Sequence, residues 1–346
     1  MNSPSLSVLV RIFGRTLFSM WMGDDVDQAA SAAPDVVSDA DRWSPPDLSG
    51  FVAVVTGANR GAGRGVARVL GRCGATVYVT GRSRAGRSST TAGEDVTLSE
   101  TARMVSDLGG IGIAVEVDHA VDAEVEVLFT KVQHEQGKLD ILVNNAWGGY
   151  SVTDGTLDEP FWLQPMLRFD RMWTVGVRSN LVATRLGLPL LLAAGRGLVV
   201  NTTLMFADLA HDIGALVGEA PADLEKPASE GHAGCALFYR TAKLAINQMT
   251  LYMAKDLAWN GHRVAMVALS PGFMRTEAIM DEVGSDAGHW YTEPILDGTE
   301  STELTGRGVV ALATDNEILA KSGQTLSTRQ LARDYGYSDV DGRSPV

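Results

Sequence analysis

The sequence predicts an α/β protein in which a single doubly wound parallel sheet of about seven strands carries helices on both faces. Two observations predict this fold class. Short runs that are apolar throughout alternate along the chain with longer segments whose apolar residues recur at helical spacing. The short runs also lack the apolar–polar alternation of a sheet with one wet face, which indicates strands covered on both sides.

Seven apolar runs are expected to form the strands. In chain order they are Phe51–Thr56, Ala75–Thr80, Ile111–Val117, Leu139–Asn144, Leu198–Thr202, Val264–Leu269 and Gly323–Ser327. The last run is expected to lie near the far edge of the sheet.

Two of the connecting segments carry a clear helical stripe. The first stripe ends before Gly74 and consists of Val66, Val69, Leu70 and Cys73. The second consists of Val121, Val125, Leu128, Phe129 and Val132. The connection from Arg82 to Leu98 is polar, glycine-rich and unusually long, so we expect an exposed loop there.

Length, charge and cysteine content limit the function classes. A chain of 346 residues with 45% apolar and 21% charged residues can bury a large core. The net charge of −13 argues against binding to nucleic acid and against broad attraction to anionic membranes. Cys73 and Cys235 match no metal or redox spacing, and His211 and His232 lack a partner at metal-ligand spacing. The sequence therefore predicts no metal site and a reducing, cytoplasmic setting.

Residues 1–47 are predicted to form an amphipathic arm and an acidic linker, ahead of a folded domain over 48–346. Within residues 6–22 the polar side chains recur every four residues, which places them on one side of a helix; they are Ser7, Arg11, Arg15 and Ser19. The segment is short for a bilayer span and carries two arginines, which argues against a transmembrane helix. Three interpretations stay open: an arm that packs on a partner subunit, an anchor that contacts a membrane surface, and a targeting sequence.

A polar segment over 208–235 interrupts the alternation of strands and helices. It comes after the fifth predicted strand, and ligands bind at the carboxyl ends of the strands in sheets of this kind. We therefore predict a substrate lid there, with a plain surface excursion as the alternative.

The first strand runs into the glycine-rich loop Thr56-Gly57-Ala58-Asn59-Arg60-Gly61-Ala62-Gly63, and a helix follows. In a dinucleotide site the pyrophosphate must approach the backbone closely and meet free N–H groups at a helix start. Gly57 would allow the tight turn, Gly61 the close approach, and Gly63 the packing of the helix against the strand. The loop therefore predicts a Rossmann-type site for a nicotinamide dinucleotide.

The end of the second strand indicates which dinucleotide is bound. An NAD site commonly has an acidic residue there, which binds the ribose hydroxyls. The stretch Thr80-Gly81-Arg82-Ser83-Arg84 offers no acid. Arg82, together with Arg60 of the loop, can instead bind a 2′-phosphate through charge-assisted hydrogen bonds. We expect NADP(H) as the cofactor, and two solvated surface arginines are the alternative.

Tyr239 and Lys243 stand four residues apart, which places both on one face of a helix. A free phenol has a pKa of about 10 and is a poor acid or base at neutral pH. A neighbouring ammonium favours the phenolate, and lowering the pKa by 2–3 units requires roughly 3–4 kcal/mol. The pair predicts that Tyr239, assisted by Lys243, transfers a proton during hydride exchange with a carbonyl or alcohol substrate.

These motifs follow one another in the order of a known family. The chain from about Leu48 to its end resembles the short-chain dehydrogenase/reductase (SDR) family. The motifs that carry the resemblance are the glycine loop, Asp118, Asn144-Asn145-Ala146, Tyr239 with Lys243, and Pro271-Gly272. Three further segments resemble the dehydrogenase/reductase member-1-like branch of this family, namely 145–149, 160–162 and the tail over 331–343.

The resemblance implies roles for further residues. Asp118 would contact the adenine, Asn145 the ribose side, and Lys243 the nicotinamide ribose. Pro271 and Thr276 would lie at the nicotinamide, where Thr276 would meet the carboxamide. The family also implies an NAD(P)-dependent enzyme, a small-molecule substrate and a homo-oligomer that forms through the Tyr–Lys helix and its neighbour.

Two positions depart from the family pattern. The family has a serine at the end of the fifth strand that donates a hydrogen bond to the substrate carbonyl, and Thr203 matches this serine best. If the register slips by one residue, Leu204 takes that place and the donor is lost. The family's relay asparagine in the preceding helix aligns with Gly176, and Asn180 lies one turn further on.

Three functions therefore stay open. An NADP(H)-dependent reductase or dehydrogenase is the preferred one. A nucleotide-binding scaffold or redox sensor with little turnover is motivated by Thr203 and Gly176, and a different chemistry such as epimerisation could use the same fold. The aromatic residues that could line an apolar substrate site are Trp147, Tyr150, Phe161, Trp162 and Phe206.

Overall fold

The computed structural model describes residues 43–82, 97–149, 159–205, 236–286, 288–293, 296 and 298–344. Three predicted features lie wholly or mainly outside these residues: the arm and most of its linker, the loop after the second strand, and the lid over 208–235. Among the helices that are described, none combines the length and the apolar character needed to cross a bilayer.

Seven parallel strands form one sheet, in the order β3-β2-β1-β4-β5-β6-β7. The strands are β1 (Val52–Thr56), β2 (Thr76–Gly81), β3 (Ile111–Glu116), β4 (Ile141–Asn144), β5 (Gly197–Thr202), β6 (Val264–Ser270) and β7 (Thr325–Ser327). The predicted fold class is confirmed, since each expected run contains one of these strands or overlaps it closely.

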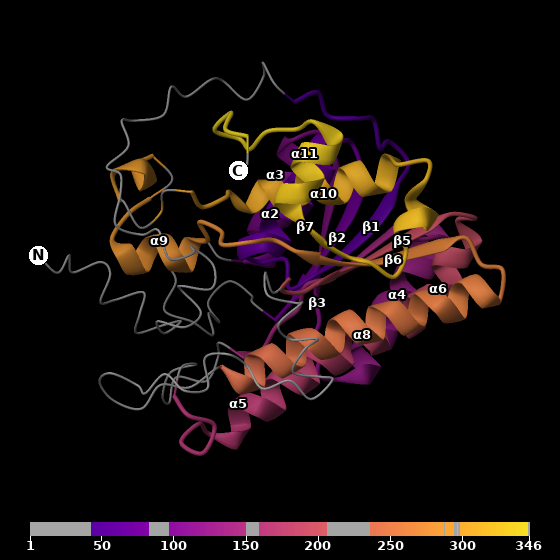
Figure 1. Ribbon diagram of the computed structural model, residues 1–346. Helices are drawn as coiled ribbons and strands as arrows, with labels where there is room; N and C mark the ends of the chain where they lie inside the picture. The colour runs from indigo at the N-terminus through magenta and orange to yellow at the C-terminus, as the bar shows by residue number, and fades with distance from the viewer. Residues whose placement is uncertain are drawn as a thin grey trace, which may run out of the picture.

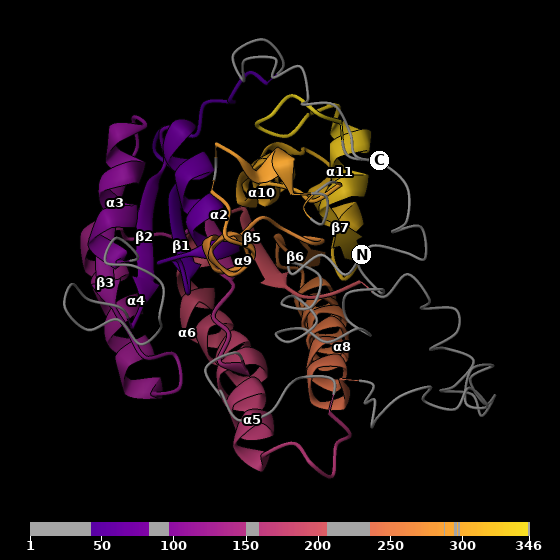
Figure 2. The ribbon, with the colours of Figure 1, turned by 90° about the vertical axis from the view of Figure 1, so that its left-hand side faces the viewer.

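Helices cover both faces of the sheet, as Figures 1 and 2 show. On one side lie α2 (Gly61–Arg72), α3 (Leu98–Asp107), α10 (Thr302–Thr314) and α11 (Thr328–Tyr335). On the other lie α4 (Asp122–Gln136), α6 (Ser179–Ala193) and α8 (Leu237–Trp259). The remaining helices among the described residues are α5 (Met166–Arg171), the π-helical segment Met172–Arg178 that joins α5 to α6, α9 (Glu277–Val283), and the short 3-10 helices Trp290–Thr292 and Ile318–Lys321.

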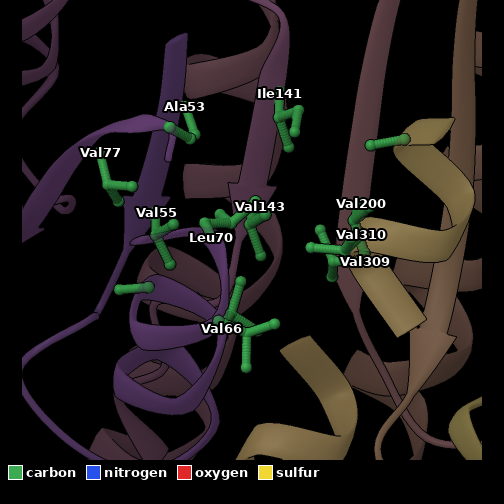
Figure 3. Close-up of a cluster of buried hydrophobic side chains, with 14 of the residues drawn as sticks. Ala53, Val55, Val66, Leu70, Val77, Ile141, Val143, Val200, Val309 and Val310 are labelled. Atoms are coloured by element: carbon green, nitrogen blue, oxygen red, sulfur yellow. The ribbon is translucent and has the colours of Figure 1, made fainter. Parts of the chain in front are cut away.

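Alternate residues of the strands face two separate cores, which explains why the strands are apolar throughout. Val55 of β1 packs in the core that contains Val66 and Leu70 of α2, and Figure 3 shows this cluster. Its neighbour Val54 packs in the opposite core, with Leu128 of α4. Strand β1 therefore buries both of its faces, as the sequence pattern predicts, whereas the edge strands β3 and β7 are only partly buried.

Helix α3 begins inside the stretch that was predicted to be a loop. Its first residue, Leu98, is buried, and the Thr97 hydroxyl caps the helix by accepting a hydrogen bond from the Glu100 N–H at 3.1 Å. The prediction that the exposed loop extends to Leu98 is wrong at this end, because a threonine cap with a glutamate three residues later starts a helix.

The sheet has its switch point at β1, which lies between β2 and β4. Thr56 at the end of β1 is in register with Thr80 of β2, and Val55 is in register with Val143 of β4. The loops that follow these three strands therefore start side by side at the carboxyl edge, where ligands bind in doubly wound sheets.

Candidate active site

The glycine loop after β1 packs tightly against the segment that follows β4. Gly57 has φ +64°, and a Cβ there would lie 2.9 Å from the Cα of Ala146. A Cβ at Gly63 would lie 2.5 Å from the Gly57 carbonyl oxygen and 2.6 Å from Nδ2 of Asn145. Only glycine fits either position, so the loop brings backbone N–H groups to the edge of the sheet without side chains in the way.

Asn145 braces this loop from the neighbouring strand. Its Nδ2 donates hydrogen bonds to the carbonyl oxygens of Thr56 and Gly57, both at 3.1 Å. In return, the Thr56 hydroxyl accepts from the backbone N–H groups of Asn145 at 2.8 Å and Ala146 at 2.9 Å. The contact of Asn145 with a ribose stays a prediction, and in this structure its amide nitrogen holds the shape of the glycine loop.

The loop already binds an anion from the protein itself. The Gly61 N–H donates a hydrogen bond of 2.8 Å to Oε2 of Glu277, the first residue of α9, and Arg64 of α2 lies 3.5 Å from the other carboxylate oxygen. This carboxylate stands in for a phosphate oxygen, so the donors present fit a pyrophosphate. Thr276 lies beside them, because a Cβ at Gly61 would be 3.6 Å from its Cγ2.

Arg60 and Arg82 lie close enough to influence each other. Burial lowers the pKa of Arg60, the Glu277 carboxylate raises it, and the positive charge of Arg82 lowers it. Arg82 is exposed at the end of β2. Two guanidinium groups this close to each other at the carboxyl edge can bind one phosphate together.

Asp118 follows β3, and its Oδ1 accepts a hydrogen bond from the Ala120 N–H at 2.9 Å. The next residue, His119, was not singled out from the sequence. Its side chain is buried, and Nε2 lies 2.8 Å from the Thr80 hydroxyl at the end of β2. Burial lowers the pKa of His119 to about 4, so the ring is neutral. Its hydrogen bond with Thr80 links the segment after β3 to β2.

Tyr239 and Lys243 lie in the first turns of α8, and both are buried. The Lys243 ammonium is 5.6 Å from the centre of the Tyr239 ring and donates a hydrogen bond of 3.4 Å to the carbonyl oxygen of Thr202. Burial lowers the pKa of Lys243 from 10.5 to about 7. The structure thus brings the predicted pair together, and the amine of Lys243 titrates near neutral pH.

Trp147, which follows Asn145 and Ala146, lies against both members of the pair. Its ring meets the Tyr239 ring edge to face, with centres 5.5 Å apart, and the Lys243 ammonium lies 4.1 Å from its centre. Gly176 of the π-helical segment makes room for the indole, since a Cβ there would lie 2.3 Å from Cζ3 of Trp147. Sequence reasoning treated these two residues separately and missed their contact.

Thr203 is buried beneath α8. Its hydroxyl donates a hydrogen bond of 3.1 Å to the carbonyl oxygen of Lys243, and its N–H donates to the carbonyl oxygen of Leu269 at 2.9 Å. Leu204 packs in the apolar cluster that contains Tyr239 and Phe238. A role for Thr203 as donor to a substrate carbonyl stays a prediction, and it requires the hydroxyl to rotate away from α8.

A buried amide network supports the site from below. Nδ2 of Asn144 donates to Oδ1 of Asn201 at 2.8 Å and to the Thr184 hydroxyl at 3.0 Å. Asn201 in turn donates to the Thr250 hydroxyl at 2.8 Å. The network joins β4, α6, β5 and α8, and the polar residues inside two otherwise apolar strands were its only signal in the sequence.

The segment after β6, 271–276, is clamped by the C-terminal tail. The guanidinium of Arg275 lies 3.3 Å from Asp339, 3.0 Å from Asp341 and 3.9 Å from the centre of the Trp290 ring. Burial lowers the pKa of Arg275, and the two carboxylates raise it. The clamp fixes the residues just before Thr276, whose hydroxyl caps α9 by accepting from the Ile279 N–H at 3.3 Å.

Of the aromatic residues proposed for the substrate site, the structure places Trp147 against Tyr239. Phe161 and Trp162 are exposed and pack edge to face against each other, with ring centres 5.2 Å apart. Tyr150 and Phe206 lie outside the described residues, as do His211, His232 and Cys235. Cys73 is buried, which raises the pKa of its thiol to about 12.

Comparison with known proteins agrees with this geometry. The sequence model of the short chain dehydrogenase family matches residues 51–212. Dehydrogenase/reductase SDR family member 1 of Homo sapiens is 35% identical to the chain over 304 residues, which cover 86% of this chain and 85% of that protein. The 7alpha-hydroxysteroid dehydrogenase of Clostridium sardiniense is 26% identical over 236 residues, or 68% of this chain and 75% of that protein.

Among solved structures, hydroxysteroid dehydrogenase from Escherichia coli superposes with a TM-score of 0.59 at 23% identity. The superposition covers 81% of this chain and 96% of that one, which establishes a shared fold.

Proposed function

The chain belongs to the short-chain dehydrogenase/reductase family of oxidoreductases, and from this membership we propose that it is an NADP(H)-dependent enzyme that interconverts a carbonyl and an alcohol. One observation carries the proposal. The buried Tyr239–Lys243 pair reaches the anion-binding glycine loop through a single short segment, Asn145-Ala146-Trp147.

When bound, the nicotinamide supplies a hydride to the carbonyl carbon in one direction and accepts it from the alcohol carbon in the other. Tyr239 donates its phenol proton to the substrate oxygen during reduction and removes the alcohol proton during oxidation. The ammonium of Lys243 stabilises the phenolate, and it carries a proton at and below its pKa of about 7. Because the two groups lie close together, they titrate as a coupled pair.

The residues that would hold the cofactor come from the segments that follow β1, β2, β3, β4 and β6 at the carboxyl edge, and from helix α8. Gly57, Gly61 and Gly63 would receive the pyrophosphate, and the Glu277 carboxylate would leave the Gly61 N–H to it. Arg60 and Arg82 would bind the 2′-phosphate. The remaining contacts would be made by Asp118 at the adenine, Asn145 and Lys243 at the riboses, and Pro271 and Thr276 at the nicotinamide.

The substrate is proposed to be an apolar carbonyl or alcohol. Tyr239 is surrounded by an apolar cluster that includes Leu204, Phe238 and Met172, with Trp147 against it. Such surroundings favour a substrate whose reactive carbon carries hydrocarbon groups. The name of the Clostridium relative, a hydroxysteroid dehydrogenase, points to a secondary alcohol of this kind.

A nucleotide-binding scaffold or redox sensor with little turnover is the second candidate. The observation that favours it is the Thr203 hydroxyl, whose proton is engaged by the Lys243 carbonyl oxygen at 3.1 Å. If that bond persists when substrate binds, the chain lacks a donor that orients the carbonyl.

Association and location are also proposed. We expect a homo-oligomer through α8 and α6, where Trp259 and Leu181 are exposed. Light scattering of the purified protein tests this. A cytoplasmic enzyme is expected, and contact of residues 6–22 with a membrane surface or an organelle-targeting role is the alternative.

The proposal is tested by incubating the purified protein with NADPH and a panel of ketones and aldehydes. Wild type is compared with Tyr239→Phe, and with Tyr252→Phe as a matched control on the exposed face of the same helix. Loss of the phenol should lower kcat/KM by about 10³-fold, within the range for general acid catalysis. The Kd for NADPH should change by less than about threefold. Unchanged turnover in Tyr239→Phe refutes the mechanism, and NADPH binding without turnover of any compound supports the scaffold.

The cofactor preference is tested with Arg82→Ala. The loss of charge-assisted hydrogen bonds should weaken NADPH binding by about 10- to 100-fold while NADH changes by less than about threefold. Equal losses for both cofactors would refute the 2′-phosphate assignment.

A further inference from the structure

The indole of Trp147 lies where three parts of the molecule meet. Its ring contacts the Lys243 ammonium at 4.1 Å and the Tyr239 ring at 5.5 Å, measured between the ammonium or ring centre and the indole centre. The third neighbour is the π-helical segment Met172–Arg178, on the side of Gly176. The indole therefore touches both members of the proposed acid–base pair.

Gly176 leaves no room for a side chain. A Cβ there would come within 2.3 Å of Cζ3 and 2.5 Å of Cε3 of Trp147, both atoms of a rigid ring. The family resemblance implies a relay asparagine at this position, and an asparagine would overlap the indole. The glycine and the tryptophan thus form a size-matched pair, and the missing asparagine is explained by what fills its space.

A buried ammonium is stabilised when it lies over the face of an indole. Attraction of this kind is strongest in a desolvated site. Lys243 is buried, and its hydrogen bond to the Thr202 carbonyl oxygen is long at 3.4 Å. The Tyr239 ring contacts the same indole as the Lys243 ammonium. The indole face is therefore a substantial contact of the charged form.

We propose that Trp147 is a positioning residue, whose indole occupies the relay position opened by Gly176 and holds the Lys243 ammonium against Tyr239. The proposal rests on the proposed function of the Tyr–Lys pair. It places an aromatic face where the family pattern has the relay asparagine. Trp147 also limits the space beside Tyr239, so it contributes to the choice of substrate.

The first test measures the protonation of Lys243 directly and needs no turnover. Protein labelled with ¹³C at the lysine Cε is titrated by NMR, and the Lys243 resonance is identified by its absence in Lys243→Met. Trp147→Leu keeps much of the bulk but removes the aromatic face, so the pKa of Lys243 should fall by about one unit or more. Trp147→Phe should give a smaller fall, and Trp162→Leu, which changes an exposed indole, should leave the pKa unchanged.

A Lys243 pKa that stays the same or rises in Trp147→Leu overturns the proposal. Since the titration is read without substrate, it separates this outcome from a failure of the proposed activity. If the panel of carbonyl compounds gives turnover, Trp147→Leu should lower kcat by about tenfold or more and leave the NADPH Kd within about twofold.

The second test is a double-mutant cycle that also applies if Trp147→Leu is poorly folded. Gly176→Ala introduces a Cβ that must displace the indole, so alone it should lower the pKa of Lys243. In the Trp147→Phe background the ring is smaller, and the same substitution should shift the pKa by less than half as much. Equal shifts in both backgrounds would contradict a direct contact between residues 147 and 176 in the site.

Discussion

The glycine loop after β1 and the Tyr–Lys pair of α8 face the same edge of the sheet, but different interactions hold them in place. The loop is fixed by its backbone geometry, by two hydrogen bonds that the Asn145 amide donates to it, and by the Thr56 hydroxyl, which accepts from the Ala146 N–H. The pair is fixed by burial and by an indole that comes from another loop. Both arrangements use the segment Asn145-Ala146-Trp147, but the loop meets it through hydrogen bonds and close backbone contacts, whereas the pair meets it through an aromatic face.

This difference has a physical cause. Binding a pyrophosphate requires donors in a set geometry, which a short loop and a helix start can provide alone. Shifting the pKa of a phenol and an amine requires low polarity and a controlled distance, which only surrounding side chains can provide. The glycine loop, called the cofactor half below, is therefore expected to lose cofactor binding through backbone changes. The Tyr239–Lys243 pair, called the catalytic half, is expected to lose activity through changes in packing and charge.

The largest effect on cofactor binding is expected in the cofactor half, from Gly57→Ala. The new Cβ would lie 2.9 Å from the Ala146 Cα, at a φ of +64°. Isothermal titration should register a loss of NADPH affinity of about 100-fold or more, and the free energy of unfolding should fall by about 2 kcal/mol or more. Gly50→Ala is the matched control, since Gly50 has φ +82° but no atom within 4 Å of a Cβ. Similar losses in both variants would mean that backbone strain alone, and not the contact with Ala146, limits this position.

The cofactor half could be predicted well from the sequence because its determinants are close together in the chain. Gly57, Gly61 and Gly63 stand close together in the chain, and the structure has Gly57 in the turn after β1 and the other two in the first turn of α2. The positions of the strands also followed from their apolar runs, and β1 buries both of its faces, although the edge strands β3 and β7 are only partly buried. The sequence did not indicate that Glu277, far along the chain, accepts a hydrogen bond from the Gly61 N–H.

The second effect concerns the catalytic half: removing the Lys243 amine should lower activity but raise stability. Because burial lowers the pKa of Lys243 to about 7, the folded chain binds fewer protons at this site than the unfolded chain between about pH 7 and 10.5. The penalty of burying the amine is therefore fully present at pH 7 and below, and it disappears as the pH rises toward 10.5. Lys243→Met should lower kcat/KM by about 100-fold.

The same variant should raise the free energy of unfolding by on the order of 2 kcal/mol near neutral pH, after allowance for lost contacts. Denaturant unfolding at several pH values measures the difference, which should shrink above pH 9. A variant that is less stable than wild type at pH 7, or a difference independent of pH, would show that the buried amine carries no such penalty.

The catalytic half could be predicted only in part from the sequence. The spacing of Tyr239 and Lys243 identified the pair, but nothing local links Trp147 to Gly176, which lie in different loops and helices. Gly176 read alone suggests a missing relay group, whereas the structure reveals an indole in its place. Likewise, the hydroxyl direction of Thr203 depends on how α8 packs over β5, which no motif specifies.

The smallest effect is expected in the cofactor half, from a change to the Glu277 carboxylate that binds the Gly61 N–H. Glu277→Gln removes the charge from the Gly61 N–H but keeps a side chain of the same size. Affinity for both NADPH and NADH should increase by about three- to tenfold, because a like charge near the pyrophosphate is removed. The control Glu317→Gln changes an exposed glutamate and should leave the affinity for both cofactors unchanged. Unchanged or weaker binding in Glu277→Gln would mean that the carboxylate does not compete with the cofactor.

The most direct test of the account is the ionisation of Tyr239 itself. Protein labelled with ¹³C at the tyrosine Cζ is titrated by NMR with saturating NADP⁺, and the Tyr239 resonance is identified by its absence in Tyr239→Phe. We expect a Tyr239 pKa about 2–3 units below the ordinary value of about 10, and a return toward 10 in Lys243→Met. A Tyr239 pKa at or above 10 in the NADP⁺ complex, unchanged by removal of Lys243, would contradict it.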